Sequence, residues 1–249
     1  MDEAPTESLQ PAYKRVLLKL SGEAFGHQGK SGISIDETLN IARQAQRIVQ
    51  SGVQLAIVVG GGNILRGANF SAGGEIIKLA TAHYMGMLAT VMNGLALQQA
   101  LESLGCETRM TTALRMDNVA EPYIQRRAIR HLEKKRIVIL AGGTGNPFVT
   151  TDTAAALRGR ELEVDVILKA TNVEGVFTED PRINPHAVMY DRLTYEVAVQ
   201  RYLRFMDMQA ISTCREGKLP ILVFNFNKEG NIERAIAGHP IGTLIKESF

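Results

Sequence analysis

The chain of 249 residues contains no tryptophan, only two cysteines, and no apolar run long enough to span a bilayer. Cys106 and Cys214 are far apart and lack the spacing of metal ligands, which favours a reduced pair over a disulfide. The first residues are acidic and polar, without the basic and apolar regions of a signal peptide. We therefore expect a cytoplasmic protein in which residues 1–12 form a flexible tail.

A large excess of charge is also missing, because 28 Lys and Arg are balanced by 26 Asp and Glu, for a formal net charge of +2. This balance demands no polyanionic partner. The one basic cluster, at residues 126–136, is more typical of a solvated helix face than of a nucleic-acid site. The hydrophobic content of 45% and the lack of a Pro-, Gly- or Ser-rich linker favour a single domain over residues 13–249.

Several enzyme classes are disfavoured by motifs that do not occur. The chain has no G-x-x-x-x-G-K-[ST] loop of the P-loop ATPases, no H-R-D or D-F-G set of the protein kinases, and no G-x-S-x-G elbow of the serine hydrolases. No G-x-G-x-x-G opens a helix, so nothing supports a dinucleotide-binding domain. The five histidines are scattered and do not combine with cysteine at zinc spacing.

Short apolar runs alternate with helical patterns along the chain. Strands are predicted at residues 15–20, 53–59, 106–111, 137–140, 164–168, 221–224 and 243–245. Helices are predicted between Asp36, as N-cap, and Gly52, at residues 76–104, 122–135, 196–202, 207–215 and 232–237, and from residue 153 onward. This alternation indicates an α/β sandwich with a mostly parallel central sheet. The helix at 76–104 is apolar over more than one stripe, which indicates burial against another subunit as well.

Polar stretches with glycine follow four of the predicted strands, at residues 19–22, 60–66, 141–152 and 169–180. Because parallel strands end at one edge of a sheet, these loops should converge. Together with residue 207 they supply three cations, Lys19, Arg66 and Lys169, and three anions, Asp152, Asp180 and Asp207. Each feature alone has an ordinary explanation, such as a tight turn for GGGN or an N-cap for Asp152. Their joint occurrence favours phosphoryl transfer, which needs positioning and charge neutralisation.

The sequence of these stretches resembles the bacterial UMP kinases of the amino acid kinase superfamily. The segments that carry the resemblance are KLSGEA at residues 19–24, GGGNILRG at 60–67, MGMLATVMNGLAL at 85–97, GTGNPFVTTDTAA at 143–155, LKATNVEGVFTEDP at 168–181 and KLPILVFN at 218–225. The resemblance implies a three-layer αβα sandwich around a mixed, mostly parallel sheet. It implies transfer of the ATP γ-phosphate to UMP, giving UDP and ADP, with Mg²⁺ bound through the nucleotide phosphates and no protein metal site. It also implies a homohexamer, and makes GTP a candidate activator and UTP a candidate inhibitor.

The resemblance also assigns roles to individual residues. The N-terminal part would bind UMP and the C-terminal part ATP, with Asp152 orienting Lys19. Lys169 is an additional candidate cation. The implied catalytic residues are Lys19, Arg66, Asp152 and Asp207. The implied ATP site contains Lys19, Leu20, Ser21, Gly22, Gly62, Arg66, Thr171, Phe177 and Asp180, and the implied UMP site contains Gly61, His83, Thr144, Gly145, Asn146, Pro147, Phe148, Val149, Thr150 and Thr151.

One position departs from the family pattern. His83 stands where the family usually has an aspartate that binds the ribose hydroxyls, and a neutral imidazole cannot offer two carboxylate oxygens. Two alternatives follow. The chain could be a related kinase acting on a carbamate or carboxylate, against which TGNPFVTTD argues. It could also be a nucleotide-binding storage or sensor protein without catalysis, which only His83 favours.

Overall fold

The computed structural model describes residues 10–27, 29–65 and 76–249, and its centre is a sheet of nine strands. The strand order is β4-β3-β5-β2-β1-β6-β8-β9-β7, and within this sheet only the β8–β9 pair is antiparallel. The strands are β1 (Arg15–Leu20), β2 (Gln54–Val59), β3 (Thr108–Thr112), β4 (Glu121–Pro122), β5 (Ile137–Ala141), β6 (Val166–Thr171), β7 (Arg192–Thr194), β8 (Ile221–Asn225) and β9 (Thr243–Lys246). The predicted mixed, mostly parallel sheet is confirmed.

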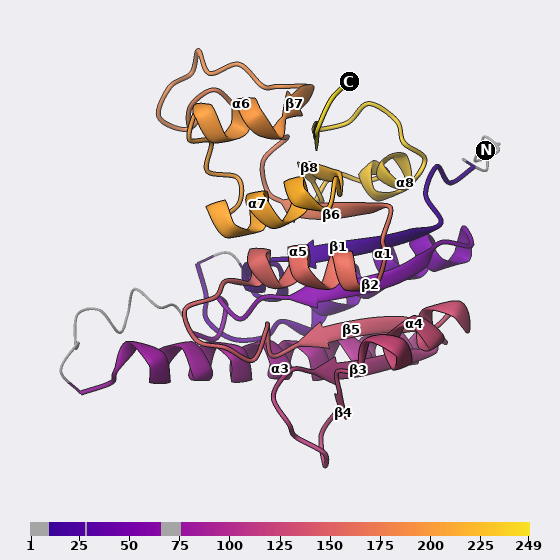
Figure 1. Cartoon of the computed structure of the whole chain (residues 1–249). Coiled ribbons are helices and arrows are strands. Elements are labelled where there is room, and N and C mark those ends of the chain that lie inside the picture. Colours follow the sequence, from indigo (N-terminus) through magenta and orange to yellow (C-terminus); the bar gives the residue numbers. More distant parts are fainter. Residues whose placement is uncertain (1–9, 28, 66–75) are drawn as a thin grey trace.

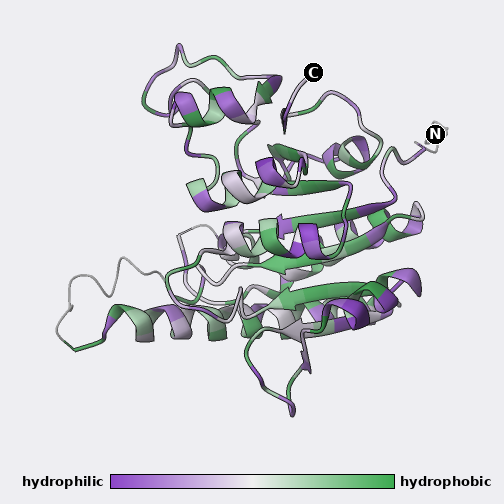
Figure 2. Ribbon diagram, viewed as in Figure 1, coloured by the Kyte–Doolittle hydropathy of each residue, from purple (hydrophilic) through white to green (hydrophobic). Residues whose placement is uncertain are grey.

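Helices cover both faces of the sheet and complete three layers (Figure 1). They are α1 (Ile35–Gln50), α3 (Leu79–Ser103), α4 (Gln125–Glu133), α5 (Thr151–Glu161), α6 (Tyr195–Gln200), α7 (Met208–Glu216) and α8 (Asn231–Ile236), with a 3₁₀ turn, η1, at Gly22–Phe25. One core lies under α1, α3 and α8, and the other under α4, α5, α6 and α7. Figure 2 shows the strands between them as predominantly hydrophobic, as buried parallel strands require.

The alternation of side chains along β1 decides which layer each residue faces. Val16, Leu18 and Leu20 belong to the core under α1, whereas Leu17 belongs to the core under α5. Because successive side chains of a strand point to opposite faces, Lys19 points to the α5 side. The Lys19 side chain therefore faces α5, the helix that begins at the end of the polar loop of residues 141–152.

Some details differ from the sequence predictions. Ser34, whose side chain accepts a hydrogen bond from the Glu37 amide, caps α1, so the prediction of Asp36 as the cap was wrong. The short strands β4 and β7 were not predicted, because two or three residues carry too little periodicity. Residues 1–9 of the expected tail lie outside the described residues.

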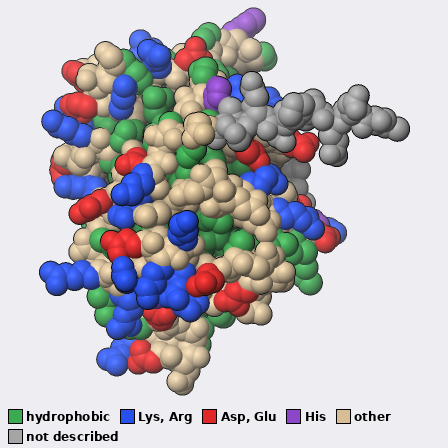
Figure 3. All heavy atoms as spheres, turned by 90° about the vertical axis from the view of Figure 1, so that its right-hand side faces the viewer, with side chains coloured by type: hydrophobic (Ala, Val, Ile, Leu, Met, Phe, Trp, Pro, Cys, Tyr) green, Lys and Arg blue, Asp and Glu red, His purple; other side chains and the backbone are tan. Residues whose placement is uncertain are grey.

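Among the described helices, none is long and apolar enough to cross a membrane. In Figure 3, Lys and Arg side chains gather low on the face at the right of Figure 1, interspersed with acidic ones. The basic residues in and after α4 are exposed, as a solvated helix face requires: Arg126, Arg127, Arg130, Lys134 and Lys135.

Candidate active site

Two lysines lie next to each other near the carboxyl ends of the central strands. In the parallel pairing of β1 with β6, Lys19 is the register partner of Lys169, so both side chains point to the same face of the sheet. Each residue is buried, with 8% and 9% of its surface exposed. Two ammonium groups are therefore held together where water is largely excluded, which requires a nearby anion.

The required anion is Asp152, the second residue of α5. Its Oδ1 lies 2.7 Å from the Lys19 Nζ, and its Oδ2 accepts a hydrogen bond of 2.6 Å from the Lys169 Nζ. We call Lys19, Asp152 and Lys169 the triad. Its formal charge is +1, so the triad leaves one positive charge available to a further anion.

The environment shifts the pKa of two triad members. Burial, and after it the Lys19 ammonium, lower the pKa of Lys169, and with the opposing effect of Asp152 the pKa is about 8. Burial acts to raise the pKa of the Asp152 carboxyl, but Lys19 and Lys169 outweigh it, and the net pKa is below its ordinary value. The carboxylate is thus ionised at neutral pH, and the site attracts negatively charged oxygen.

Asp207 supports the triad from the start of α7. As the N-cap of α7 it accepts hydrogen bonds from the Ala210 amide at 2.9 Å and from the Thr153 hydroxyl at 2.8 Å, and the Thr150 hydroxyl donates to its other oxygen. Thr150 is itself the N-cap of α5 and accepts from the Asp152 amide at 3.1 Å. Asp207 therefore fixes the helix turn that carries Asp152, and both its oxygens already have donors.

A cavity of about 570 Å³ opens beside the triad. Its lining residues are Asp152, Lys169 and the segment from Tyr202 to Met208, which joins α6 to α7. The volume lies within the range of small-molecule sites. The cavity therefore lies between the Asp152–Lys169 pair and the α6–α7 connection.

Glycines let the two loops after β1 and β2 touch. A Cβ on Gly60 would lie 2.6 Å from the Gly22 amide nitrogen, and a Cβ on Gly22 would overlap the Gly62 amide nitrogen. Among the described residues, the Gly61 and Gly62 amides donate to no protein acceptor. Free amides beside a buried lysine suit a phosphate oxygen.

The conformation of this glycine loop is held by a buried pair of amides. Asn63 and Asn93 exchange two hydrogen bonds, of 3.0 and 2.7 Å, and Asn93 also donates to the Gly60 carbonyl at 2.7 Å. Asn63 in turn donates to the Gly32 carbonyl at 2.9 Å. Helix α3 thereby positions the turn after β2 and links it to the loop at residues 26–32.

The loop between β5 and α5 is anchored at its base and exposed at its tip. The Gly142 amide donates to the Thr90 hydroxyl of α3 at 2.8 Å. At the tip, Phe148 has φ 66 and is 63% exposed, and its ring centroid lies 5.1 Å from that of His83. His83 and the loop are therefore neighbours in space. The other loop residues assigned to UMP lie on the same stretch: Thr144, Gly145, Asn146, Pro147, Val149, Thr150 and Thr151.

The residues assigned to the adenine and ribose side have protein partners of their own. The Thr171 hydroxyl donates to the Phe224 carbonyl at 3.1 Å, and Phe177 forms a β-bridge with Met189. The carboxylate of Asp180 is paired with the Arg182 guanidinium, and hydrogen bonds from Arg182 hold the pKa of that carboxyl at about 2. These three residues do not line the cavity beside the triad.

The stretch at residues 19–22 is described in full, whereas the stretch at residues 60–66 is described only to residue 65. Leu20 ends β1, and the Ser21 side chain caps the η1 turn by accepting from the Glu23 amide. Arg66, assigned to catalysis and to ATP, lies outside the described residues.

Thr150 and Thr153 were not singled out as supports of Asp152, although the pattern Thr-Thr-Asp-Thr before an alanine run is a helix-start signal that identifies the cap.

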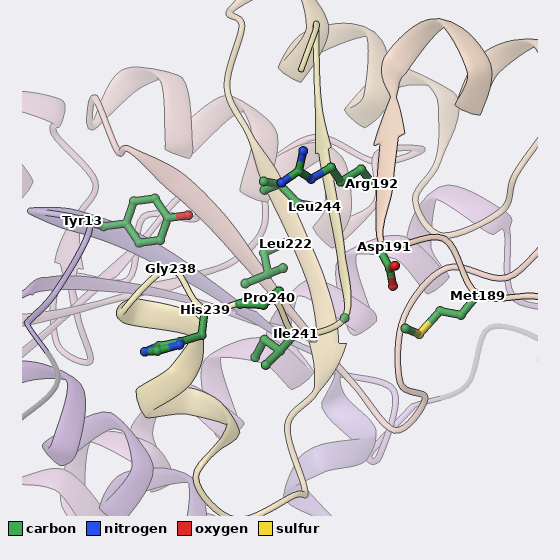
Figure 4. A pocket seen from close by; sticks show the side chains of 11 residues that line it. Tyr13, Met189, Asp191, Arg192, Leu222, Gly238, His239, Pro240, Ile241 and Leu244 are labelled. Atoms are coloured by element: carbon green, nitrogen blue, oxygen red, sulfur yellow. The ribbon is translucent and has the colours of Figure 1, made fainter. Parts of the chain in front are cut away.

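A second cavity, of about 280 Å³, lies elsewhere in the fold (Figure 4). It is lined by Tyr13 before β1, by Leu222 and Leu244, and by the loop between α8 and β9 that contains His239 and Ile241. None of the four polar loops after the strands contributes to it. The second cavity is therefore separate from the candidate site.

The chain is similar in sequence and in structure to known proteins. A model of the amino acid kinase family matches residues 14–225. The chain is 54% identical over 233 residues to "Uridylate kinase PUMPKIN, chloroplastic" of Arabidopsis thaliana, covering 94% of the chain and 68% of that relative. The structure of a UMP kinase from Bacillus anthracis superposes with a TM-score of 0.92 at 41% identity, covering 95% of this chain and 97% of the other. A UMP kinase from Ureaplasma parvum gives 0.88 at 33%, covering 94% and 99%.

Proposed function

The chain belongs to the amino acid kinase family, and on this premise we propose that it transfers the γ-phosphate of ATP to UMP, giving UDP and ADP. The observation that carries the proposal is the triad, with two buried lysines on one carboxylate and a net positive charge at the strand ends. Phosphoryl transfer moves a highly charged group between two anionic oxygens, so fixed positive charge is what the reaction requires.

The reaction needs little proton chemistry from the protein. The attacking oxygen of UMP is already anionic, so no general base is required. Lys19 bridges toward the transferred phosphoryl group, Lys169 supplies the second ammonium, and Asp152 keeps both in place. The Gly61 and Gly62 amides and Arg66 add donors for phosphate oxygens, which makes positioning and electrostatics the main contributions of the protein.

The two substrates enter from opposite sides of the triad. The loop of residues 144–151 holds UMP, and the cavity beside Lys169 accepts the polyphosphate of ATP. Among the described residues, no group of three or more His, Cys, Asp and Glu side chains is placed to hold a metal ion. Because both Asp152 oxygens are paired with lysine ammonium groups and both Asp207 oxygens accept hydrogen bonds, Mg²⁺ would be held by the nucleotide phosphates, whose negative charge it would neutralise.

His83 affects how the site recognises the acceptor nucleotide. In place of a carboxylate the chain has an imidazole, in contact with the Phe148 ring of the acceptor loop. Phe148 and the loop amides therefore take a larger share in recognising the nucleoside monophosphate. The complete triad argues against the alternative of a silent nucleotide-binding protein, since binding alone does not need two buried lysines.

An assay of ADP release tests the function directly. With ATP and Mg²⁺, we expect turnover on UMP and much slower turnover on CMP and dTMP, measured by a coupled enzyme assay with each acceptor. No turnover on any acceptor, in protein that still binds ATP, would overturn the kinase. Equal turnover on CMP and UMP would instead contradict the acceptor specificity.

Helix α3 offers a surface for assembly into the homohexamer that we also propose. Four large apolar side chains on α3 are exposed: Tyr84, Leu88, Met92 and Leu95, at 44%, 45%, 52% and 38%. Their spacing of four, four and three residues places them on one helix face. The first turns of α3 project beyond the rest of the molecule (Figure 1), so a second copy can reach this stripe. An apolar stripe of this kind is typical of an interface between subunits.

Charge on the stripe should break the assembly. Replacing Leu88 and Met92 together by glutamate is expected to reduce the mass in solution, because two charges would be buried at the contact. Light scattering after gel filtration measures this mass. Ile183→Glu, at a residue that is 83% exposed outside α3, is the matched control and should keep the wild-type mass. Wild-type protein with a mass of 27.3 kDa would contradict the assembly.

A further inference from the structure

Four helices end in the same way, with a residue other than glycine in the left-handed conformation. These residues are Lys135 after α4, Glu163 after α5, Tyr202 after α6 and Lys218 after α7, with φ of 60, 53, 52 and 49. At Tyr202 the amide donates to the Val199 carbonyl, and the next amide, of Leu203, donates to the Ala198 carbonyl, both at 3.1 Å. Lys135 repeats this pattern with Leu132 and His131. Glycine or asparagine is favoured at this position because a Cβ is strained there.

Tyr202 differs from the other three in its side-chain type and in its position beside the cavity. The other three side chains are charged and exposed, as expected at a helix end. Tyr202 is aromatic and 80% exposed, so its ring gains little from packing against the protein. It also lines the cavity that contains Asp152 and Lys169. Folding stability therefore does not explain a tyrosine in a strained backbone position.

The lining of this cavity contains both kinds of group that bind a nucleotide. Lys169 supplies an ammonium group, paired with Asp152, and Tyr202 supplies a flat aromatic ring. A nucleotide has phosphates at one end and a flat base at the other, and bases stack on aromatic side chains. The geometry points to Tyr202 as a further binding residue for the donor: its ring packs on the base of ATP or ADP while the phosphates extend to Lys169. This assignment rests on the proposed function, because it takes the cavity as the donor site.

Replacing Tyr202 by glycine should stabilise the fold and weaken ADP binding. Tyr202→Gly should raise the melting temperature by about 2–4 °C, because glycine accepts the left-handed conformation. The same variant should raise the dissociation constant for ADP at least about fivefold, measured by calorimetry, because the stacking contact is lost. Tyr202→Phe keeps the ring and should bind ADP as the wild type does. Tyr202→Asn is a second variant that suits the backbone and lacks the ring.

Two controls separate stacking from other effects. Lys135→Gly makes the same backbone change far from the cavity, so it should raise the melting temperature and leave ADP binding unchanged. Inorganic tripolyphosphate has no base, and it should bind Tyr202→Gly and the wild type equally.

Three results would overturn the inference. One is a dissociation constant for ADP in Tyr202→Gly or Tyr202→Asn within about twofold of the wild type, a change too small for a stacked base. Another is an equal loss of tripolyphosphate binding, and the third is wild-type protein that does not bind ADP. The proposed function fails separately, since protein that binds ADP normally but does not phosphorylate UMP would refute the kinase and leave the role of Tyr202 intact.

Discussion

Replacing Lys19 by methionine is expected to lower kcat by about 10²–10³-fold, as loss of one transition-state donor does in other enzymes. The dissociation constant for UMP should change little, because the ammonium contacts the transferred phosphoryl group and that contact strengthens in the transition state. Methionine is close to lysine in length, so the buried space stays filled. The carboxylate of Asp152 keeps its hydrogen bond to Lys169, and the pair left behind is neutral. The loss should therefore appear in kcat, measured at saturating ATP and UMP, and not in stability.

The neighbouring residue Lys14 provides the matched control for Lys19. It is exposed just before β1, and Lys14→Met should keep both kcat and the melting temperature. Calorimetric titration with UMP supplies the binding half of the comparison. A kcat for Lys19→Met within about tenfold of the wild type would remove Lys19 from the mechanism, since one lost donor costs more than this.

The alternation of strands and helices could be predicted because it depends on local periodicity. Apolar runs that end in glycine-rich loops identify parallel strands and their carboxyl ends, and this was enough to bring the four loops to one edge. Lys19, Asp152 and Lys169 were each found in this way. That Lys19 and Lys169 are direct partners depends on the register of β1 with β6, which joins positions 150 residues apart (169 minus 19) and leaves no mark in either segment.

The contacts that tie α7 to the start of α5 could not be predicted, because they depend on which donors meet in space. The catalytic role assigned to Asp207 stays a prediction, and the structure shows in addition that Asp207 holds the N-terminus of α5 through Thr150 and Thr153. Asp207 and Thr153 are 54 residues apart in the sequence, so no local pattern predicts the hydrogen bond between them. Tyr202 was predicted only as the end of a helix. Its importance comes from a left-handed backbone and a neighbouring cavity, and neither follows from residue type.

Replacing Asp152 by asparagine is the second change with a large expected effect, this time on stability as well as rate. Asparagine has almost the same shape but no charge, so Lys19 and Lys169 would face each other without a counter-ion. Removing one partner of a buried ion pair costs about 3–5 kcal/mol, so the melting temperature should fall by roughly 6–20 °C at pH 7. Thermal unfolding followed by circular dichroism measures this shift.

The pH dependence identifies the lysine responsible. In the wild type the pKa of Lys169 is lowered from 10.5 to about 8, so the unfolded chain binds more protons between these values and stability rises with pH there. Asp152 opposes that lowering, so its loss moves the pKa of Lys169 down further. The deficit of Asp152→Asn should thus be large at neutral pH and shrink as the pH rises past about 8, where Lys169 is neutral in both proteins. A deficit that does not depend on pH would assign the effect to packing.

Removing the second lysine together with the aspartate separates structure from catalysis. Asp152→Asn combined with Lys169→Met removes the repulsion between the two ammonium groups and leaves only that of Lys19 buried, so part of the lost stability should return. The rate should not return, because the double variant lacks both the second ammonium and the carboxylate that orients Lys19. Recovered folding with recovered turnover would show that the triad only holds the sheet ends together. Recovered folding without turnover is expected if the two lysines are kept, at a cost to stability, for the phosphoryl group.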